Sequence, residues 1–391
     1  MKRLEDVEFS GKTVFLRVDF NVPLDEKGEI RDDTRIRAAL PTLNYLLSQS
    51  AKLVIASHLG RPKGQFSPKF SLKPVAERLS QLLGREVRLA PGVVGDEVES
   101  LKRELKGGQA LLLENVRFQA AETANASSFA QELARGIDVY VNDAFGACHR
   151  AHASVVAIAQ YVREKAAGYL LEKEIDYLNR AVRRPEKPYV AVLGGAKVSD
   201  KIPVIESLLN KADHILIGGA MAYTFFKAQG LDVGKSLVEE ELKDKALEIL
   251  DKARQSKVDF VLPLDHLLAT AVDKGAVTEV ASSFPFPADK MAVDIGPQTI
   301  QRYAGIIAAS RTIFWNGPLG IFEIDKFSQG TVKIAQAVAQ AKALSIVGGG
   351  DSIAAVEKAG VSSKISHIST GGGASLEYLA KGTLPGIEAL G

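Results

Sequence analysis

Short apolar runs alternate with longer amphipathic segments along the whole chain. The runs are rich in valine, isoleucine and leucine, and many of them end at glycine, proline, asparagine or aspartate. Near-continuous apolar strands separated by helices are typical of parallel sheets that are covered on both faces. The pattern therefore predicts an α/β protein with strands at residues 13–19, 52–57, 86–90, 110–115, 138–143, 189–194, 214–219, 258–263, 312–317, 344–349 and 365–369.

These strands are too many for one compact sheet, and a helical segment divides them into two groups. In that segment apolar residues recur at helical spacing until prolines end the pattern (Leu170, Leu171, Ile175 and Leu178, then Pro185 and Pro188). We predict two doubly wound, Rossmann-like parallel-sheet domains at residues 1–168 and 189–374, joined by a hinge helix at 169–188. The alternative is a surface helix inside a single domain.

Composition and charge narrow the class of protein. The 391 residues include 49 Lys and Arg against 47 Asp and Glu, a balance that argues against nucleic acid or an anionic membrane as the main partner. Cys148 is the only cysteine, so no intrachain disulfide can form, and a reducing compartment is favoured. The N-terminus lacks the apolar region of a signal peptide, and no apolar run reaches membrane-spanning length. We expect a soluble cytoplasmic protein.

In open parallel sheets, ligands bind beyond the carboxyl ends of the strands. In the first half of the chain, arginines and histidines lie in or beside the segments that follow strands: Arg35, Arg61, Arg117 and Arg150, with His58, His149 and His152. Converging guanidinium groups suit a small polyanion, although any one of them alone is better explained as a solvated surface side chain. A zinc site is disfavoured, because there is a single cysteine and no paired Cys/His cluster.

Asp19 and Asn21 follow the first strand directly, in the stretch "RVDFNVP". One interpretation is a turn, in which both side chains satisfy the local backbone. The other is that a carboxylate among arginines holds a ligand hydroxyl, which phosphate contacts cannot specify.

In the second half, "GGAKVSDK" lies between a strand and a helix that we predict to be capped by Asp200. Lys197 and Lys201 then lie at a helix N-terminus, where the helix dipole disfavours cations unless an anion binds there. Two solvated lysines are the alternative.

Two glycine triplets, Gly348–Gly350 and Gly371–Gly373, precede predicted helices. Glycines before a helix allow backbone amides to approach phosphate oxygens closely. Asp351 is either the cap of its helix or a Mg²⁺ partner beside phosphates, and both uses are compatible.

The chain contains no G-x-G-x-x-G dinucleotide motif, no complete P-loop and no protein-kinase motif set. The residues thus predict one domain for a small polyanion and another for a nucleotide-like phosphate chain, with phosphoryl transfer between them. A non-catalytic two-lobed binding protein for a phosphorylated metabolite is the alternative, and it would need the arginines but not the lysines or Asp351. A dehydrogenase would need the absent dinucleotide motif.

Ten motifs in order resemble the phosphoglycerate kinase family over Val14 to Pro385: "RVDFNVP", "DDTRIRAALPT", "SHLGRPKG", "LLLENVRF", "YVNDAFG", "HRAHAS", "GGAKVSDKI", "NGPLGIFE", "VGGGDS" and "HISTGGGASLE". The resemblance implies reversible transfer of a phosphoryl group from 1,3-bisphosphoglycerate to ADP, giving 3-phosphoglycerate and ATP in glycolysis. It also implies Mg²⁺ as cofactor, a monomer with small-molecule partners only, and a C-terminal tail, 375–391, that packs on the N-terminal domain.

The resemblance further implies roles for individual residues. The phosphoglycerate site would comprise Asp19, Phe20, Asn21, Arg35, His58, Leu59, Gly60, Arg61, Arg117 and Arg150. The nucleotide site would comprise Lys201, Gly218, Gly219, Asn316, Glu323, Gly349, Gly350, Asp351 and Ser352, with Asp351 toward the metal. Catalytic stabilisation of the phosphoryl group in flight would come from Arg35, Lys197 and the amides of Gly371, Gly372 and Gly373.

Overall fold

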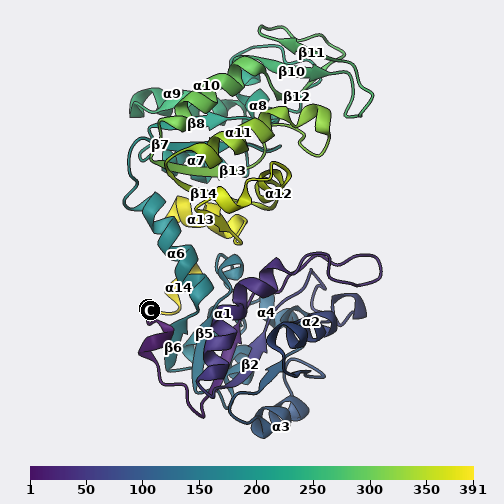
Figure 1. Ribbon diagram of the computed structural model, residues 1–391, viewed down its shortest axis with the longest axis vertical. Helices are drawn as coiled ribbons and strands as arrows, with labels where there is room; N and C mark the ends of the chain where they lie inside the picture. The colour runs from purple at the N-terminus through teal and green to yellow at the C-terminus, as the bar shows by residue number, and fades with distance from the viewer. The chain divides into compact units, whose positions relative to one another are not determined.

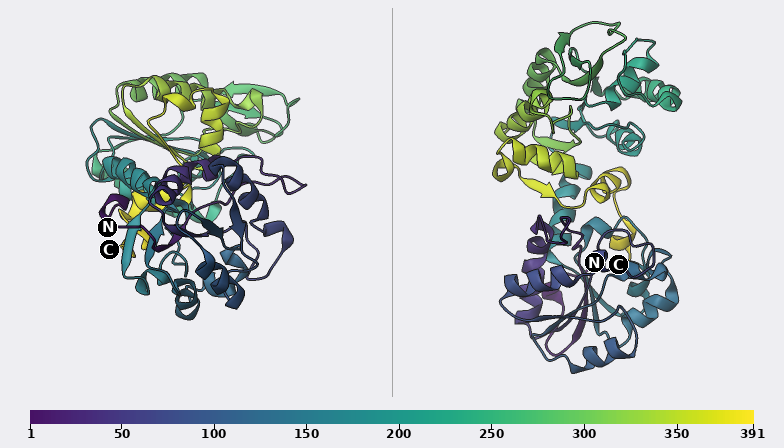
Figure 2. Two further views of the ribbon diagram at one scale, coloured as in Figure 1. Left: turned by 60° about the horizontal axis from the view of Figure 1, so that its bottom comes forward. Right: turned by 90° about the vertical axis from the view of Figure 1, so that its right-hand side faces the viewer.

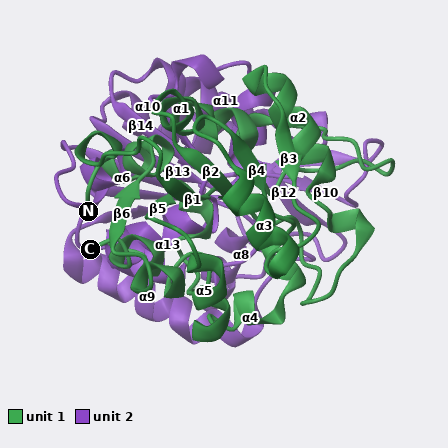
Figure 3. Cartoon of the chain, turned by 90° about the horizontal axis from the view of Figure 1, so that it is seen from below, with its two compact units in different colours: residues 1–176, 383–391 green, residues 177–382 purple.

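The computed structural model describes all residues, 1–391, and the chain forms two compact units (Figure 1). Unit 1 contains residues 1–176 and 383–391, and unit 2 contains residues 177–382 (Figure 3). The boundary falls within helix α6 (Tyr169–Val182), inside the segment predicted as a hinge helix. Each unit has its own sheet and apolar core.

Unit 1 is built on a six-stranded parallel sheet with strand order β3-β4-β2-β1-β5-β6. The strands are β1 (Thr13–Arg17), β2 (Lys52–Ala56), β3 (Val87–Leu89), β4 (Ala110–Leu112), β5 (Val139–Asn142) and β6 (Glu164–Ala167). The helices, besides the first part of α6, are α1 (Thr34–Ser48), α2 (Lys73–Leu83), α3 (Asp96–Glu104), α4 (Ala120–Thr123), α5 (Ser127–Ala134) and α14 (Pro385–Glu388). A continuous apolar core joins α1 and α2 to the central strands.

The sheet of unit 1 changes direction at β1, which pairs with β2 on one side and with β5 on the other. At such a switch point the loops that follow neighbouring strands diverge and leave room for a ligand. The segments that follow β1, β2, β4 and β5, together with the first turn of α1, carry the predicted polar residues of the first half of the chain.

Unit 2 contains a second six-stranded parallel sheet, with strand order β15-β14-β13-β7-β8-β9. Its strands are β7 (Tyr189–Leu193), β8 (His214–Ile217), β9 (Asp259–Val261), β13 (Thr312–Asn316), β14 (Leu344–Gly348) and β15 (His367–Ser369). The helices are α7 (Ile202–Leu208), α8 (Met221–Ala228), α9 (Lys243–Ser256), α10 (Pro297–Ala308), α11 (Gln329–Gln340), α12 (Gly350–Lys358) and α13 (Gly373–Lys381). The order reverses between β7 and β13, which pair in register from Tyr189 and Thr312 to Leu193 and Asn316.

The prediction of an α/β fold with two parallel sheets is confirmed, and each of the eleven predicted strands is present. Two features were not predicted. One is β6, a sheet-edge strand whose sequence "EKAA" has no β-branched residue. The other is a three-stranded antiparallel sheet of β10 (His266–Ala269), β11 (Thr278–Ala281) and β12 (Met291–Ile295). Its strands are short, and β11 has no buried residue, so it gives no hydrophobic signal.

The C-terminal segment that belongs to unit 1 begins at Thr383, and not at the predicted residue 375. Residues 375–382 lie in unit 2 because α13 packs there, with Ser375, Tyr378 and Leu379 buried. The last residues return to unit 1, where the amide of Gly386 donates a hydrogen bond of 2.9 Å to the carbonyl of Cys148. The two chain ends accordingly lie near each other in both views of Figure 2.

None of the helices is both long and apolar enough to cross a lipid bilayer.

Candidate functional site

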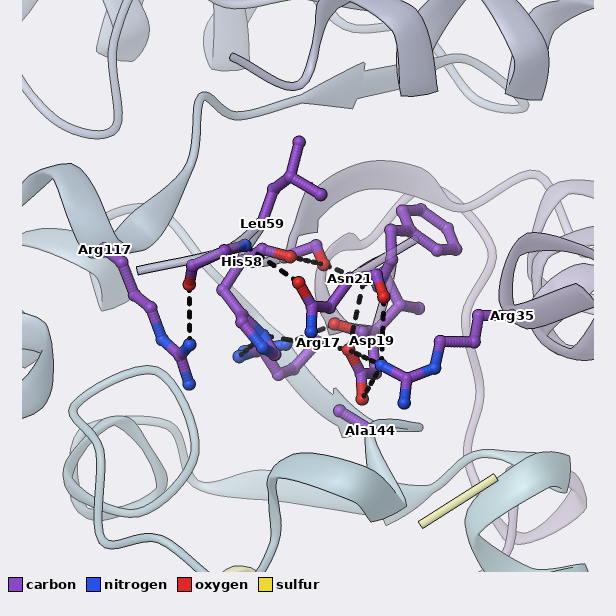
Figure 4. A network of polar contacts seen from close by, with 12 residues as sticks. Arg17, Asp19, Asn21, Arg35, His58, Leu59, Arg117 and Ala144 are labelled. Atoms are coloured by element: carbon purple, nitrogen blue, oxygen red, sulfur yellow. Dashed lines mark hydrogen bonds and ion pairs between the residues drawn. The ribbon is translucent and has the colours of Figure 1, made fainter. Parts of the chain in front are cut away.

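In unit 1 the loop after β1 carries Asp19 and Asn21, and hydrogen bonds hold both side chains in place (Figure 4). Asp19 Oδ1 accepts from the Asn21 amide at 3.2 Å, the turn interaction that was one of the two interpretations of this loop. Asn21 Oδ1 accepts from the Gly60 amide at 2.8 Å and so joins the loop after β1 to the loop after β2. The structure therefore brings two of the predicted segments into one cluster.

Arg35 extends this cluster from the first turn of α1. Its Nη1 lies 3.3 Å from Asp19 Oδ2 and donates to the Asn21 carbonyl at 3.1 Å. The Arg35 side chain is about one-third exposed, and that of Asp19 is largely buried. Burial by itself would raise the pKa of Asp19, yet the neighbouring His58, Arg35 and Arg17 lower it below its ordinary value. Asp19 is thus a carboxylate within a positively charged surface.

His58 follows β2 and is buried beside Asp19, with 3.8 Å between Nδ1 and Asp19 Oδ1. Burial lowers the pKa of His58 well below its ordinary value, and Arg17, Arg117 and Arg35 lower it further, whereas Asp19 opposes them. The imidazole is therefore neutral at physiological pH. Arg17, the last residue of β1, has a fully buried side chain, and its Nη2 lies 3.3 Å from His58 Nδ1.

Arg117 lies in a 3₁₀ turn (Val116–Phe118) after β4. Its Nη1 donates to the Gly60 carbonyl at 2.8 Å, but its Nε is buried and has no hydrogen-bond partner. Burial lowers the pKa of Arg117 to about 10, and Arg17 and Arg150 contribute to the shift. A guanidinium with an unused donor beside other cations is a favourable site for an anion.

The remaining predicted residues of unit 1 lie around this cluster. Arg61 and Arg150 are exposed, and Arg150 Nε donates to His149 Nε2 at 3.0 Å. Phe20 and Leu59 are buried, and their backbones belong to the same loops: the Phe20 amide donates to Ser57 Oγ at 2.8 Å. These two residues shape the site and offer no charge to a ligand.

Unit 2 contains a cavity of about 1010 Å³ at the carboxyl ends of its strands. Its lining combines glycines with charged and amide side chains: Gly194, Gly195, Lys197, Asp200, Lys201, Asn316, Gly317, Gly349, Gly350, Asp351, Ser352, Gly372, Gly373, Glu377 and Lys381. The cavity therefore lies at the switch point between β7 and β13, where nucleotides bind in doubly wound sheets.

The glycines of unit 2 differ in what an added side chain would meet. At Gly194 a Cβ atom would lie 2.1 Å from the Pro318 carbonyl oxygen, so close packing of the protein itself excludes a side chain there. At Gly350 and Gly373, by contrast, no protein atom lies within 4 Å of the Cβ position, and neither residue has a positive φ. Nothing in the protein requires glycine at these two helix starts. These two helix starts leave open space beside the cavity that both residues line, and a helix N-terminus of this kind suits an anion.

Lys201, Asn316 and Gly348 form a chain of contacts along the wall of this cavity. The Lys201 ammonium donates to Asn316 Oδ1, and Asn316 Nδ2 donates to the Gly348 carbonyl at 2.7 Å. Burial lowers the pKa of Lys201, although Asp200 and Asp351 oppose the shift. The adjacent loop is fixed by Ser352, whose Oγ accepts from the Gly317 amide at 2.6 Å.

Lys197 is exposed at the cavity, in the loop before α7. The prediction that Asp200 caps this helix is wrong, because α7 begins at Ile202 and Lys201 occupies the cap position. The loop amides are instead satisfied by Glu239, which accepts from Val198 at 2.5 Å and from Ser199 at 3.1 Å. A carboxylate some forty residues away thus takes the place that the sequence assigned to a local cap.

Asp351 is exposed in the first turn of α12, and the cap position is occupied by Gly349, so the interpretation of Asp351 as the cap is wrong. Asp351 also borders a second, more apolar cavity of about 360 Å³, which Gly219 and Glu323 line. At Gly218 the Leu319 side chain would contact a Cβ atom, at 2.4 Å.

No group of three or more His, Cys, Asp or Glu side chains is arranged to hold a metal ion. One carboxylate beside a phosphate site does suit Mg²⁺, which takes most of its ligands from phosphates and water.

Four residues that support these sites were not predicted: Arg17, Glu122, Ser154 and Glu239. Ser154 Oγ accepts from Arg17 Nε at 2.8 Å and donates to Glu122 Oε1 at 2.6 Å. Arg17 reads as an ordinary polar residue of a strand, and Ser154, with which it pairs, lies 137 positions away. The sequence signal that could have identified Arg17 is its position inside the apolar run "TVFLRVD". A parallel strand that is covered on both faces is normally apolar, so an arginine within it is expected to be buried.

Two α/β units, one with a cationic cluster and one with a glycine-lined cavity at a switch point, define a protein that handles phosphorylated small molecules. The family profile described as "Phosphoglycerate kinase" matches residues 4–382. The phosphoglycerate kinase of Acidobacterium capsulatum is 55% identical over 99% of this chain and 98% of its own length. That of an Anaeromyxobacter species is 54% identical over 100% and 99%.

Solved structures agree with this relationship. The phosphoglycerate kinase structure from Coxiella burnetii has a TM-score of 0.89 and 43% identity, covering 99% of this chain and 98% of that one. The structure from Pyrococcus horikoshii has a TM-score of 0.84 and 38% identity, with coverages of 100% and 98%. The chain belongs to the phosphoglycerate kinase family. It is a glycolytic kinase, a phosphotransferase with a carboxyl group as acceptor, and the alternative of a non-catalytic binding protein is not favoured.

Proposed function

We propose that the chain transfers a phosphoryl group reversibly from 1,3-bisphosphoglycerate to ADP, giving 3-phosphoglycerate and ATP. The observation that carries this proposal is the cavity of unit 2, where Gly350 and Gly373 leave open backbone beside Lys197 and Lys201. Such a cavity suits a phosphate chain. Family membership supplies the identity of both substrates.

The phosphoglycerate is assigned to the cationic cluster of unit 1. Arg35 and Arg117 would hold its phosphate and carboxylate oxygens, Arg117 with its unpartnered Nε, and the exposed Arg61 and Arg150 would complete the charge. Asp19 accepts hydrogen bonds only, so it would select the ligand hydroxyl. His58 is neutral and would donate one hydrogen bond.

The nucleotide is assigned to unit 2. The amides of Gly349 to Ser352 and the Lys201 ammonium, which Asn316 orients, would hold the phosphates. The more apolar cavity beside Gly219 and Glu323 would take the nucleoside, with Glu323 at the ribose and Gly218 packed behind the base. Mg²⁺ would be held by Asp351 and by the phosphates, and when bound it would neutralise phosphate charge.

The transferring phosphoryl group would be stabilised by Lys197, by Arg35 and by the amides of Gly372 and Gly373. Gly371, which the resemblance also implied, is buried, and its amide donates to Ser369 Oγ at 3.2 Å, so it would support the turn and not contact the ligand. The acceptor oxygen already carries negative charge in either direction, so no general base is needed, and catalysis consists of positioning and electrostatic stabilisation. Since donor and acceptor bind to separate units in this proposal, the units must approach each other during turnover, and α6 would act as the hinge. We further propose that the enzyme works as a cytoplasmic monomer without nucleic-acid partners.

A coupled assay for ATP formation from ADP and 1,3-bisphosphoglycerate tests the reaction directly. Binding titrations with Arg117→Ala test the assignment of the sites. We expect the affinity for 3-phosphoglycerate to fall about tenfold or more, because a charge-assisted hydrogen bond contributes roughly 1.5–3 kcal/mol, while the affinity for ADP stays unchanged. The reverse pattern would mean that the two ligands have been assigned to the wrong units.

A further inference from the structure

Arg17 is a fully buried cation that the proposed reaction does not use. It is the last residue of β1 and contacts His58, and it takes part in none of the ion pairs of the structure. A buried guanidinium is costly unless its donors are satisfied. Each of its three nitrogen atoms has a partner: Nε donates to Ser154 Oγ at 2.8 Å, Nη1 donates to the Val18 carbonyl, and Nη2 lies 3.3 Å from His58 Nδ1. Figure 4 shows Arg17 beside His58.

The contact with His58 defines where the imidazole carries its proton. A guanidinium has five N–H donors and no acceptor, so His58 Nδ1 must accept the hydrogen bond from Arg17. Asp19 Oδ1, 3.8 Å from the same nitrogen, does not reach hydrogen-bond distance. The charged groups around His58 are Asp19, Arg17, Arg117 and Arg35, three cations against one anion, which disfavours a second proton on the ring.

Arg17 is itself held in place from the far side. Ser154 Oγ, which accepts from Arg17 Nε, donates to Glu122 Oε1 at 2.6 Å, and the Ser154 amide donates to Glu122 Oε2 at 2.9 Å. Glu122 and Ser154 are both fully buried. Glu122 thus provides a negative charge one hydroxyl group away from Arg17, and the three side chains form a relay that ends at His58.

We propose that Arg17, oriented by Ser154 and Glu122, is a positioning residue that fixes His58 as the neutral tautomer with its proton on Nε2. The imidazole then offers a hydrogen-bond donor to an anionic ligand and no positive charge. Arg17 is the partner of the ring inside the protein, so Nε2 remains for the ligand. The role of His58 in substrate binding rests on the proposed phosphoglycerate site. The tautomer of His58 follows from its contact with Arg17 and does not depend on that proposal.

Nitrogen-15 NMR of the ligand-free enzyme with labelled histidine tests the tautomer, with His58→Asn to assign the signal. We expect a neutral ring protonated on Nε2 at neutral pH. Arg17→Lys keeps the positive charge but removes the planar guanidinium group that donates in fixed directions. We therefore expect a mixture of His58 tautomers and roughly tenfold weaker binding of 3-phosphoglycerate. Ser154→Ala should change the tautomer of His58 and the affinity for 3-phosphoglycerate in the same direction but by less. If Arg17→Lys does not fold, Ser154→Ala by itself tests the proposal.

Tyr140→Phe is the matched control. The Tyr140 hydroxyl donates to the carbonyls of Ser154 and Val155, so its loss perturbs the same segment without touching the relay, and the tautomer should not change. A wild-type ring that is protonated on Nδ1 or doubly protonated would overturn the inference, as would an unchanged tautomer in both Arg17→Lys and Ser154→Ala. If the tautomer is as expected but His58→Asn binds 3-phosphoglycerate normally, the proposed site fails and the inference about Arg17 stands.

Discussion

The ammonium of Lys201 and the side-chain oxygen of Asn316 are joined by a hydrogen bond in the wall of the glycine-lined cavity of unit 2. Asn316 ends β13, and its Nδ2 is engaged with the Gly348 carbonyl at 2.7 Å, so its oxygen is oriented toward the lysine. Both side chains are buried. Asn316 therefore orients the Lys201 ammonium and stabilises its charged form, whereas burial lowers the pKa of Lys201.

Asn316→Ala should weaken ADP binding by about tenfold to a hundredfold, because Lys201 loses its orientation and its buried charge loses a partner. The pKa of Lys201 should fall further in the variant, so its ADP affinity should decline at a lower alkaline pH than that of the wild type. Isothermal titration with ADP across pH 7 to 10 measures both effects, with 3-phosphoglycerate binding as the control. Normal ADP affinity in Asn316→Ala would exclude this role.

Lys197→Ala should lower turnover far more than it weakens ADP binding. Groups aimed at a transferring phosphoryl group contribute on the order of 10²–10⁵ in rate. Lys381→Ala is the matched control, because Lys381 lines the same cavity but is paired with Glu377 at 2.6 Å. Steady-state kinetics should show a large fall in kcat for Lys197→Ala only. More than about a tenth of wild-type turnover in Lys197→Ala would rule out the stabilising role.

Gly350→Ala and Gly373→Ala should separate ligand binding from stability. At neither position does a protein atom lie within 4 Å of the place that the new Cβ atom would occupy, so thermal unfolding should be unchanged or shifted slightly upward, while nucleotide binding weakens. Two other glycines supply the controls. Gly194→Ala should destabilise the protein, since its Cβ would lie 2.1 Å from the Pro318 carbonyl oxygen, and Gly305→Ala, in the exposed interior of α10, should stabilise it by about 0.5–1 kcal/mol without affecting binding. Equal ADP affinity in all four variants would disprove the phosphate cradle.

Binding of both ligands together, but of neither alone, should reduce the radius of gyration. Phosphoryl transfer needs donor and acceptor oxygens within a few ångströms and needs water excluded, and in our proposal the two substrates bind to separate units. Small-angle scattering of the free enzyme, of each binary complex and of the ternary complex with Mg²⁺ measures this. An active enzyme whose radius of gyration is the same in all four states would contradict the hinge proposal.

The sequence predicts those parts of the protein whose signals are local. Segments such as "VDFVLP" and "TIFWNG" are apolar enough to be recognised as buried strands, and each glycine triplet directly precedes a helix in the sequence. The relay of Arg17, Ser154 and Glu122 joins residues more than thirty positions apart, and Glu239 reaches the Lys197 loop across about forty. Such contacts depend on how the strands are ordered in the sheet, which local periodicity does not encode. The tertiary fold also replaced the local cap predicted at Asp200 by Glu239.

Asp143 gives unit 1 a distinctive dependence of stability on pH. It follows β5 and is fully buried, and its Oδ1 accepts from the Leu171 amide at 3.1 Å in the first turn of α6. Its Oδ2 is buried without a hydrogen-bond partner. Burial raises the pKa of Asp143 to about 7, although hydrogen bonds from Thr42 and Leu171 oppose the rise. Burial therefore disfavours the ionised form of Asp143 in the folded protein, compared with the unfolded chain.

The direction of the effect follows from the two pKa values. Between about pH 4 and pH 7 the folded protein keeps a proton on Asp143 that the unfolded chain has lost, so the free energy of unfolding falls as the pH rises. A shift of about three units corresponds to at most roughly 4 kcal/mol, with no further loss above pH 7. Asp143→Asn, a neutral isostere, should remove this contribution, so that the variant gains stability relative to the wild type as the pH rises from 4 to 8. Urea unfolding of both proteins across this range measures the effect. Asp176→Asn, which removes an exposed carboxylate from α6, is the control. A constant difference between Asp143→Asn and the wild type at every pH would mean that Asp143 is ionised in the folded protein and that α6 is anchored by a carboxylate rather than by a carboxylic acid.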